Sequence, residues 1–403
     1  MSRVLFVDDE PHVLDALRRM LHPMGKRWEL VFASSGQEAL AILEQAQFDI
    51  IVTDMRMPGM DGAQLLAEVM DRYPNMVRIV FSGHSDPAFI LRSVKAAHQY
   101  LAKPCDPQIL CSTIERALSL RGLFSDHSVQ ELVSQIESLP SLPSVYEEIP
   151  AELHSPDPSP QRVGNIVAKD LAMTAKILQL VNSAFFGLFS RVTNAVEAVR
   201  YLGIETVKAL ALSLHLFSEL RPTPLEGFSV EELWEHSLKV AGAARAVAWN
   251  DTHDPSIADA SFTAGLLHDS GRLIMATKLP QRYAPILEQV AKEGRNLWEV
   301  ERNSLGTSHG EVGAYLLGIW GLPQDVVEAV LFHHEPSRGL SSVGGVDPLI
   351  AVHVSDAFLL QRDGGPGGPA GPGPDRGHLD SLGLGDRLQG WEEICEKTWG
   401  KDG

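Results

Sequence analysis

The segment FDIIVTDMRMPGMDG, residues 48–62, decides the fold of the first part of the chain. An apolar run typical of a buried strand ends directly in Asp54, and a turn follows it. Other apolar runs stand before and after it, namely VLFV, WELVF, VRIVFSG and QYLAKP, with segments of helix length between them. This alternation, from residue 3 to about residue 121, predicts an α/β domain with a doubly wound, five-stranded parallel sheet.

Polar side chains follow the apolar runs at the points where the predicted strands end. These residues are Asp8 and Asp9 after the first run, Asp54 after the third, Ser82 after the fourth and Lys103 after the fifth. Because the carboxyl ends of parallel strands meet at one edge of a sheet, we expect these side chains to lie close together. Clustered carboxylates suit Mg²⁺, and a fixed lysine suits a phosphoryl oxygen. Any one of these residues alone could be an ordinary solvated loop residue, but the ordered set favours a phosphoryl-transfer site.

Four segments carry a family resemblance: VDDE at residues 7–10, TDMRMPGMDG at 53–62, FSGH at 81–84 and YLAKP at 100–104. Together they resemble the flavodoxin-like receiver domain of two-component response regulators over its whole length. The resemblance implies that Asp54 accepts a phosphoryl group from a sensor histidine kinase. It also implies that Mg²⁺ is held by Asp8, Asp9, Asp54 and the backbone carbonyl of Arg56.

The same resemblance assigns roles to three further residues of the receiver. It implies that Lys103 pairs with the phosphate and that Ser82 is the hydroxyl that moves toward it. Tyr100 stands where such domains place an aromatic switch residue. An aromatic residue on a fifth strand is also common in a plain core, so both interpretations of Tyr100 stay open.

The strand rhythm stops after about residue 122, and the later periodicity is helical. We therefore predict a receiver domain at 1–122, a linker helix at 123–138, an all-α output domain at 139–362, and a Gly/Pro-rich linker with a C-terminal tail at 363–403. Helices are expected at residues 163–181, 195–216, 231–249, 258–279, 311–317, 325–332 and 348–360. The tail contains Trp391 and Trp399 and favours a short docked helix.

Histidines and aspartates recur along the predicted helices of the output domain. They are His236, His268, Asp269, His309, His333, His334 and Asp356. Histidine is the commonest transition-metal ligand, and an adjacent His-Asp pair can supply an imidazole and a bridging carboxylate to a dinuclear Fe, Mn or Zn centre. The alternative is a buried hydrogen-bond network, since a lone histidine on an apolar helix is more often a core residue. Glu232, four residues before His236, is either an extra ligand or a solvated helix charge.

The order of these residues resembles the HD metal-dependent phosphohydrolase superfamily. The segments AMTAKILQLVNSAFFG, YLGIETVKAL, AGLLHDSGRL, SHGEVGAYLLGIWGLP and VLFHHE resemble more closely the HD-related output domain, HDOD. That family is regarded mainly as a signalling module without established catalysis. The related cyclic di-GMP phosphodiesterases carry a GYP segment that this chain lacks, and Arg272 stands where they usually have lysine. Both departures weigh against cyclic di-GMP as a substrate.

Composition limits the classes of function that remain. The 403 residues include 44% hydrophobic and 21% charged residues, which is typical of globular domains. A net charge of −18 repels nucleic acid and anionic lipid, and no basic cluster or helix-turn-helix offsets it. The three cysteines fit no disulfide framework, which favours the cytoplasm. No apolar stretch approaches the roughly 20 residues that span a bilayer.

The sequence therefore predicts a cytoplasmic response regulator whose receiver, phosphorylated on Asp54, controls an HDOD domain that acts by binding a downstream protein. Self-association as a homodimer stays open. The alternative is an enzyme in which the same switch gates a metal-dependent phosphohydrolase acting on a nucleotide or a cyclic dinucleotide. Whether the chain is an enzyme at all is left undecided between these two.

Overall fold

The computed structural model describes most of the chain. The described ranges are 2–83, 96–121, 158–182, 191–203, 225–341, 345–363 and 371–400, with single positions at 133, 136, 148, 149, 152, 155 and 343. The predicted linker helix at 123–138 lies outside them, apart from Val133 and Ile136. So do most of the motif YLGIETVKAL and the second half of the helix predicted at 195–216.

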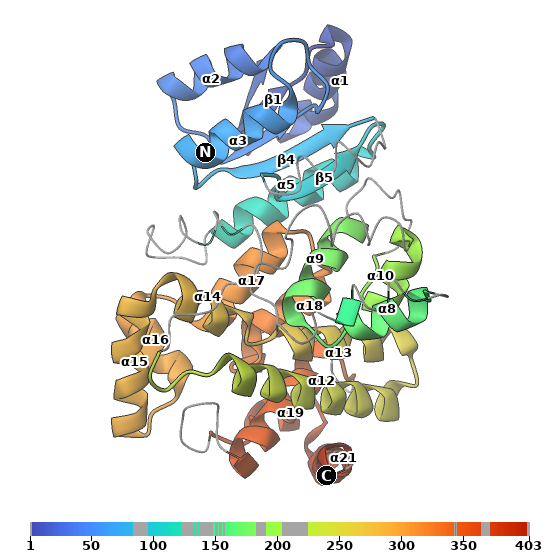
Figure 1. The fold of residues 1–403 in the computed structure, drawn as a ribbon, viewed down its shortest axis with the longest axis vertical. Helices are drawn as coiled ribbons and strands as arrows, with labels where there is room; N and C mark the ends of the chain where they lie inside the picture. The colour runs from blue at the N-terminus through green and yellow to red at the C-terminus, as the bar shows by residue number, and fades with distance from the viewer. Residues whose placement is uncertain are drawn as a thin grey trace.

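The first part of the chain forms the predicted five-stranded parallel sheet (Figure 1). Its strands are β1 (Ser2–Val7), β2 (Trp28–Ala33), β3 (Ile50–Thr53), β4 (Val77–Ser82) and β5 (Gln99–Ala102). The order across the sheet is β2-β1-β3-β4-β5, and every neighbouring pair is parallel. The described helices of this domain are α1 (Pro11–Leu21), α2 (Gly36–Gln45), α3 (Gly62–Arg72) and α5 (Pro107–Arg121), with a 3₁₀ turn at His22–Lys26.

The register of the central strands places the first and third strand ends side by side. Val7, the last residue of β1, is the partner of Thr53, the last residue of β3. The backbone N–H of Asp54 then donates to the carbonyl of Val7 at 2.8 Å. Because the strands are buried on both faces, this register is held by apolar side chains such as Phe6 and Ile51.

Described residues after 158 form the predicted helical domain. Its helices are α8 (Pro160–Val167), α9 (Leu171–Val181), α10 (Ala195–Leu202), α12 (Val230–Thr252), α13 (Pro255–Leu267), α14 (Ser270–Lys278), α15 (Pro280–Glu293), α16 (Leu297–Leu305), α17 (His309–Ile319), α18 (Gln324–Phe332), α19 (Pro348–Asp363), α20 (Arg376–Ser381) and α21 (Leu388–Trp399). Short 3₁₀ turns lie at Pro336–Arg338 and Gly385–Arg387. The fold class is therefore confirmed.

Helix boundaries inside this domain differ from the sequence prediction. The helix expected at 163–181 is two helices: the first ends at Val167, and Asp170 caps the start of the second by accepting the N–H of Met173. The helix expected at 258–279 breaks at Asp269, whose backbone is not helical (φ −96°, ψ 11°). Helices α15 and α16 were not predicted, since Pro285 lies inside the first and Gly294, with a left-handed backbone, follows its last residue.

The C-terminal segment docks on the helical domain, as the tryptophans of the tail led us to expect. Helix α21 packs against α12 and α19. Trp391 and Cys395 are buried, and the indole N–H of Trp399 donates to the carbonyl of Lys239 at 3.0 Å. In the part of the chain that the structure describes, no helix is long and apolar enough to cross a membrane.

The receiver contacts the helical domain through β5 and α5 (Figure 1). Helix α5 packs against α17. The side chain of Gln99 on β5 donates to the carbonyl of Gly318 at 3.2 Å, and Gln179 on α9 donates to the carbonyl of His98 at 2.9 Å. The guanidinium of Arg116 on α5 donates to the carbonyl of Leu322 at 3.1 Å. The edge strand β5 is thus in direct contact with the helical domain.

Helices α14 and α17 contact each other closely at Gly271, and a substitution there tests this packing. A Cβ atom on Gly271 would lie 1.9 Å from the carbonyl oxygen of His309. We expect Gly271→Ala to lower the free energy of unfolding by about 1–3 kcal/mol, because the backbones must separate. Urea denaturation measures this change.

Gly390→Ala is the matched control for that variant, since Gly390 is exposed on α21 and, apart from its own helix backbone, no atom of the described residues lies within 4 Å of the place that its Cβ would take. There the substitution should raise stability by roughly 0.5–1 kcal/mol through helix propensity. Equal stability of Gly271→Ala and the wild type would contradict the close crossing.

Candidate functional sites

The first candidate site lies at the carboxyl edge of the receiver sheet, where Asp8 and Asp54 end neighbouring strands. The ammonium group of Lys103 bridges them: it donates to the carboxylate of Asp8 and, at 2.6 Å, to Oδ1 of Asp54. Oδ2 of Asp54 accepts the backbone N–H of Arg56 at 2.6 Å. Both carboxylates are buried, so Lys103 compensates charges that water does not reach.

Opposing effects set the protonation of this pair. Burial raises the pKa of Asp54 above its usual range, and the hydrogen bond and charge of Lys103 only partly offset that. For Lys103, burial alone would lower the pKa, but the hydrogen bonds to Asp54 and Asp8 outweigh it and the pKa is raised. Lys103 therefore stays a cation at neutral pH.

The other receiver residues singled out from the sequence surround this pair. Asp9 and Ser82 are half-buried at strand ends. The backbone N–H of Lys103 donates to the carbonyl of Ser82 at 3.0 Å, and the Lys103–Pro104 peptide bond is cis. Tyr100 is buried on β5, opposite Val80 of β4. The side chains of Asp8, Asp54 and Lys103 are thus in direct contact, with Asp9 and Ser82 at the same edge.

The second candidate site is a cluster of histidines and aspartates in the helical domain. His236 comes from α12, His268 and Asp269 join α13 to α14, His309 begins α17, His333 and His334 follow α18, and Asp356 lies in α19. All seven residues named in the sequence analysis meet here. They form three groups of three potential ligands, and within each group the ligand atoms lie within 4.8 Å of one another. The group of His268, Asp269 and His333 shares one histidine with each of the other two groups.

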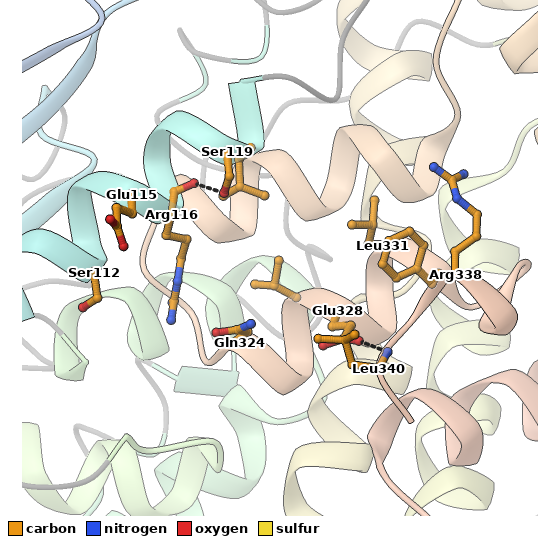
Figure 2. A pocket seen from close by; sticks show the side chains of 12 residues that line it. Ser112, Glu115, Arg116, Ser119, Gln324, Glu328, Leu331, Arg338 and Leu340 are labelled. Atoms are coloured by element: carbon orange, nitrogen blue, oxygen red, sulfur yellow. Dashed lines mark hydrogen bonds between the residues drawn. The ribbon is translucent and has the colours of Figure 1, made fainter. Parts of the chain in front are cut away.

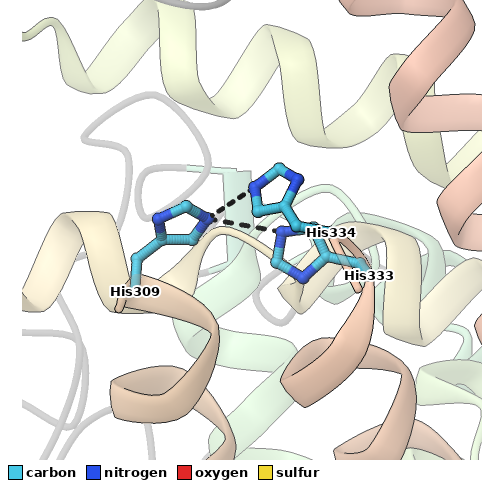
Figure 3. A group of neighbouring side chains, drawn as sticks. All are labelled: His309, His333 and His334. Carbon is cyan, nitrogen blue, oxygen red and sulfur yellow. Dashed lines mark hydrogen bonds between the residues drawn. The ribbon is translucent and has the colours of Figure 1, made fainter. Parts of the chain in front are cut away.

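Short distances join the two halves of this cluster. Nε2 of His309 lies 3.0 Å from Nε2 of His334 and 3.3 Å from Nε2 of His333 (Figure 3). On the other side, Nε2 of His236 lies 3.0 Å from Oδ1 of Asp356. Asp269 lies between them, since Oδ1 is 3.3 Å from Nε2 of His309 and Oδ2 is 3.7 Å from Nε2 of His268.

The outer hydrogen bonds of three histidines fix which ring nitrogen faces the cluster. Nδ1 of His268 lies 2.7 Å from the carbonyl of Gly265, and Nδ1 of His333 lies 2.7 Å from the carbonyl of Val330. A carbonyl only accepts, so each Nδ1 carries the hydrogen and each neutral Nε2 presents a lone pair. His309 points the same way because its Nδ1 lies 2.6 Å from a carboxylate oxygen of Glu301.

Charge at the centre of the cluster is not balanced by hydrogen bonds alone. Nε2 of His268 is buried and has no hydrogen-bond partner among the described residues, and it lies 3.7 Å from carboxylate oxygens of both Asp269 and Asp356. Burial lowers the pKa of His268, and burial with the neighbouring histidines lowers the pKa of His333 to about 3, so both rings are neutral. Lone pairs that face carboxylates repel unless a cation lies between them. The donor set therefore fits a transition-metal centre.

The aspartates of the cluster are charged despite their burial. Burial alone would raise their pKa values, but the charge of Arg272 holds the pKa of Asp269 well below its usual range, and the hydrogen bond from His236 lowers the pKa of Asp356. The guanidinium of Arg272 donates to Oδ2 of Asp269 at 2.9 Å. Arg272 thus orients the carboxylate that lies between the two halves of the cluster.

Two residues correct or extend the sequence-based set. Glu232 is exposed, so the solvated helix charge, and not an extra ligand, describes it. Glu301 was missed, although it is fully buried and contacts His309. It lies on α16, a helix that the periodicity did not reveal, and nothing in its spacing marked it.

Comparison with protein families gives both parts of the chain a family. The response regulator receiver domain family matches residues 4–115, and the HDOD domain family matches residues 139–336. The chain is a receiver–HDOD response regulator. This assignment confirms the resemblances to the receiver and HDOD families that the sequence carries.

Individual relatives of this receiver–HDOD response regulator match parts of it. The hydrogenase transcriptional regulatory protein HoxA of Cupriavidus necator is 41% identical over 127 residues, which cover 31% of this chain and 26% of that protein. An uncharacterized protein of Treponema pallidum is 28% identical over 203 residues, covering 50% and 39%. The chain therefore spans well under half the length of these curated relatives.

Among solved structures, the MmoQ response regulator of Methylococcus capsulatus is similar at 27% identity with a TM-score of 0.47, covering 64% of this chain and 98% of that one. An HDOD domain protein of Geobacter sulfurreducens is similar at 24% identity with a TM-score of 0.41, covering 70% and 94%.

Metal content tests the histidine and aspartate cluster directly. We expect the full-length protein, purified without chelator or affinity tag, to carry near-stoichiometric Fe, Mn or Zn, because the cluster presents lone pairs and charged carboxylates that face one another. The double variant His268→Ala/Asp269→Ala should lose this metal. Elemental analysis by mass spectrometry measures both.

Glu232→Ala is the control for the metal measurement, since Glu232 is exposed on the same helix as His236. This variant should keep the metal content of the wild type. A folded wild-type protein that holds no metal and takes up neither added Fe²⁺ nor added Mn²⁺ would contradict the metal centre.

Proposed function

We propose that this response regulator accepts a phosphoryl group on Asp54 from a histidine kinase and thereby controls its HDOD domain, which binds a downstream protein. The contact that carries this proposal is the bridge from Lys103 to Asp8 and Asp54. It joins a buried carboxylate nucleophile, a second carboxylate and a fixed cation at one strand edge. This set supports phosphoryl transfer better than a structural ion pair, because a nucleophile and its charge stabiliser lie together.

The residues at this edge divide the chemistry among them. An oxygen of Asp54 forms the new bond to phosphorus as the bond from phosphorus to the donor histidine nitrogen breaks. Lys103 is placed to pair with an oxygen of the transferred group. Asp8, Asp9, Asp54 and the backbone carbonyl of Arg56 would hold Mg²⁺, which neutralises charge on the phosphoryl group when bound.

Direct contacts supply a route from the receiver to the output domain. Tyr100 lies next to Gln99, whose side chain donates to the carbonyl of Gly318 in α17. The carbonyl of His98, on the other side of Gln99, accepts from Gln179 in α9. A rearrangement of β4 and β5 on phosphorylation would therefore change contacts with two helices of the HDOD domain.

The packing between α5 and α18 leaves space for such a change. A cavity of about 610 Å³ lies there, lined on the receiver side by Arg116 and Ser119 and on the HDOD side by Gln324 and Glu328 (Figure 2). A partly open interface can exchange one arrangement for another at lower cost than a close-packed one. This favours a contact that shifts with phosphorylation over a rigid joint.

A second candidate function is a metal-dependent phosphohydrolase gated by the same switch, acting on a nucleotide or a cyclic dinucleotide. The buried Nε2 of His268, which has no hydrogen-bond partner in the described part of the chain and lies between two charged carboxylates, favours it. His236, His268, Asp269, His309, His333, His334 and Asp356 would hold the metal, which lowers the pKa of a bound water when present. The metal measurement described above is its first test, since a cluster that binds no metal cannot carry out this chemistry.

Phosphorylation of Asp54 can be measured on the intact protein. With the small phosphodonor acetyl phosphate and Mg²⁺, we expect the wild type to gain one phosphoryl group and Asp54→Asn to gain none, because the amide lacks the nucleophilic oxygen. Phosphate-affinity electrophoresis reads the shift, and EDTA should abolish it.

Asp15→Asn serves as control for this assay, since Asp15 is an exposed carboxylate on α1. It should be phosphorylated like the wild type. Labelling that persists in Asp54→Asn, or that needs no divalent cation, would refute the proposed site.

A further inference from the structure

We infer that Glu301 is a positioning residue that aims the imidazole of His309 into the metal cluster. The inference rests on the proposed metal binding and adds a residue that none of the sequence motifs includes. One carboxylate oxygen of Glu301 accepts from Nδ1 of His309 at 2.6 Å and from the backbone N–H of the same residue at 2.8 Å. Ring and backbone of His309 are thus held by a single atom.

Burial makes this carboxylate costly unless it has a specific role. Glu301 is fully buried, and its second oxygen accepts the hydroxyl of Tyr283 at 2.8 Å. A buried carboxylate loses several kcal/mol of hydration, which its hydrogen bonds must offset. Three donors from two residues point at it, so its orientation is fixed as well as its charge.

The consequence for His309 is a defined lone pair. With the hydrogen on Nδ1 directed at Glu301, Nε2 faces His334, His333 and Asp269 at 3.0, 3.3 and 3.3 Å. A carboxylate behind a ligating imidazole sets its tautomer and raises its basicity, which strengthens metal binding. Glu301 would act through His309 and need not touch the metal.

Other residues of α16 hold the same side of the cluster. The ring of Trp298 is nearly parallel to that of His334, with centroids 6.1 Å apart. The guanidinium of Arg302 donates to Glu311 at 3.1 Å and pairs with Glu335 at 2.8 Å, which ties the start of α17 to the residue after His334. Helix α16 therefore contacts both the start of α17, which carries His309, and the segment after α18, which carries His334.

A purely structural role for Glu301 as the cap of α17 is the competing explanation. That helix already has a cap, because the hydroxyl of Ser308 accepts from the N–H of Glu311 and the Glu311 side chain accepts from the N–H of Ser308. This capping box forms without Glu301, which adds only the bond from the N–H of His309 to the same helix end. Ser308 therefore provides a control variant that weakens the same helix end and leaves the His309 ring contact intact.

The test measures Mn²⁺ affinity by calorimetry on the full-length protein, freed of metal beforehand. We expect Glu301→Leu to weaken binding by about 100-fold and Glu301→Gln by about 10-fold, because the amide oxygen still accepts Nδ1–H without the charge. Ser308→Ala should lower the melting temperature and leave the affinity within about 2-fold of the wild type. The ¹⁵N shifts of His309 in the metal-free protein should report Nδ1–H in the wild type and in Glu301→Gln, and its loss in Glu301→Leu.

The outcomes separate this inference from the proposal beneath it. A wild type that takes up neither Mn²⁺ nor Fe²⁺ overturns the metal cluster and, with it, the role of Glu301. If both Glu301 variants bind Mn²⁺ as tightly as the wild type, the role of Glu301 is overturned and the metal cluster stands. Equal loss of affinity in Ser308→Ala and Glu301→Gln would reduce Glu301 to a helix cap, and Glu301→Gln keeps the test valid should Glu301→Leu fail to fold.

Discussion

The burial of α17 is the constraint on which the position of His309 and the contact between the two domains both depend. Every residue from His309 to Ile319 is buried. At one end, a Cβ atom on Gly271 would lie 1.9 Å from the carbonyl of His309, and at the other, a Cβ atom on Gly318 would lie 2.3 Å from a methyl carbon of Leu120 in the receiver. A helix enclosed in this way moves as a body or not at all. The contact with the receiver and the position of His309 are therefore linked.

The cluster next to α17 concentrates charge that the fold alone does not need. Buried carboxylates and lone pairs that face one another cost free energy, and an apolar core of the same volume would avoid that cost. Asp269, Asp356 and Glu301 are all buried here. The presence of such a network is the physical argument for a ligand, and it is independent of any family resemblance.

Much of the receiver could be predicted from sequence because its signals are local. An apolar run that ends in a charged residue marks both the strand and the sheet edge at which that residue lies. The contact of Lys103 with Asp8 and Asp54 therefore followed from the order of the apolar runs. The convergence of the seven histidines and aspartates also matched the expected order, although metal binding itself stays a prediction.

The features that sequence could not reveal depend on tertiary contacts. The break at Asp269 is a backbone turn inside an apolar run, which periodicity reads as one helix. Glu301 and Gln99 are buried polar residues whose partners lie on other elements of the fold. Glu301 accepts from Tyr283 and from His309, and Gln99 donates to Gly318. No spacing rule identifies such partners.

We propose that the phosphorylation state of the receiver reaches the HDOD domain through α17. Hydrogen–deuterium exchange of the full-length protein, with and without the phosphoryl mimic beryllofluoride, tests it most directly. We expect exchange to change in peptides of β4 and β5 and also in peptides that cover α17, residues 309–319. A change confined to the receiver, with α17 exchanging at the same rate in both states, would contradict it.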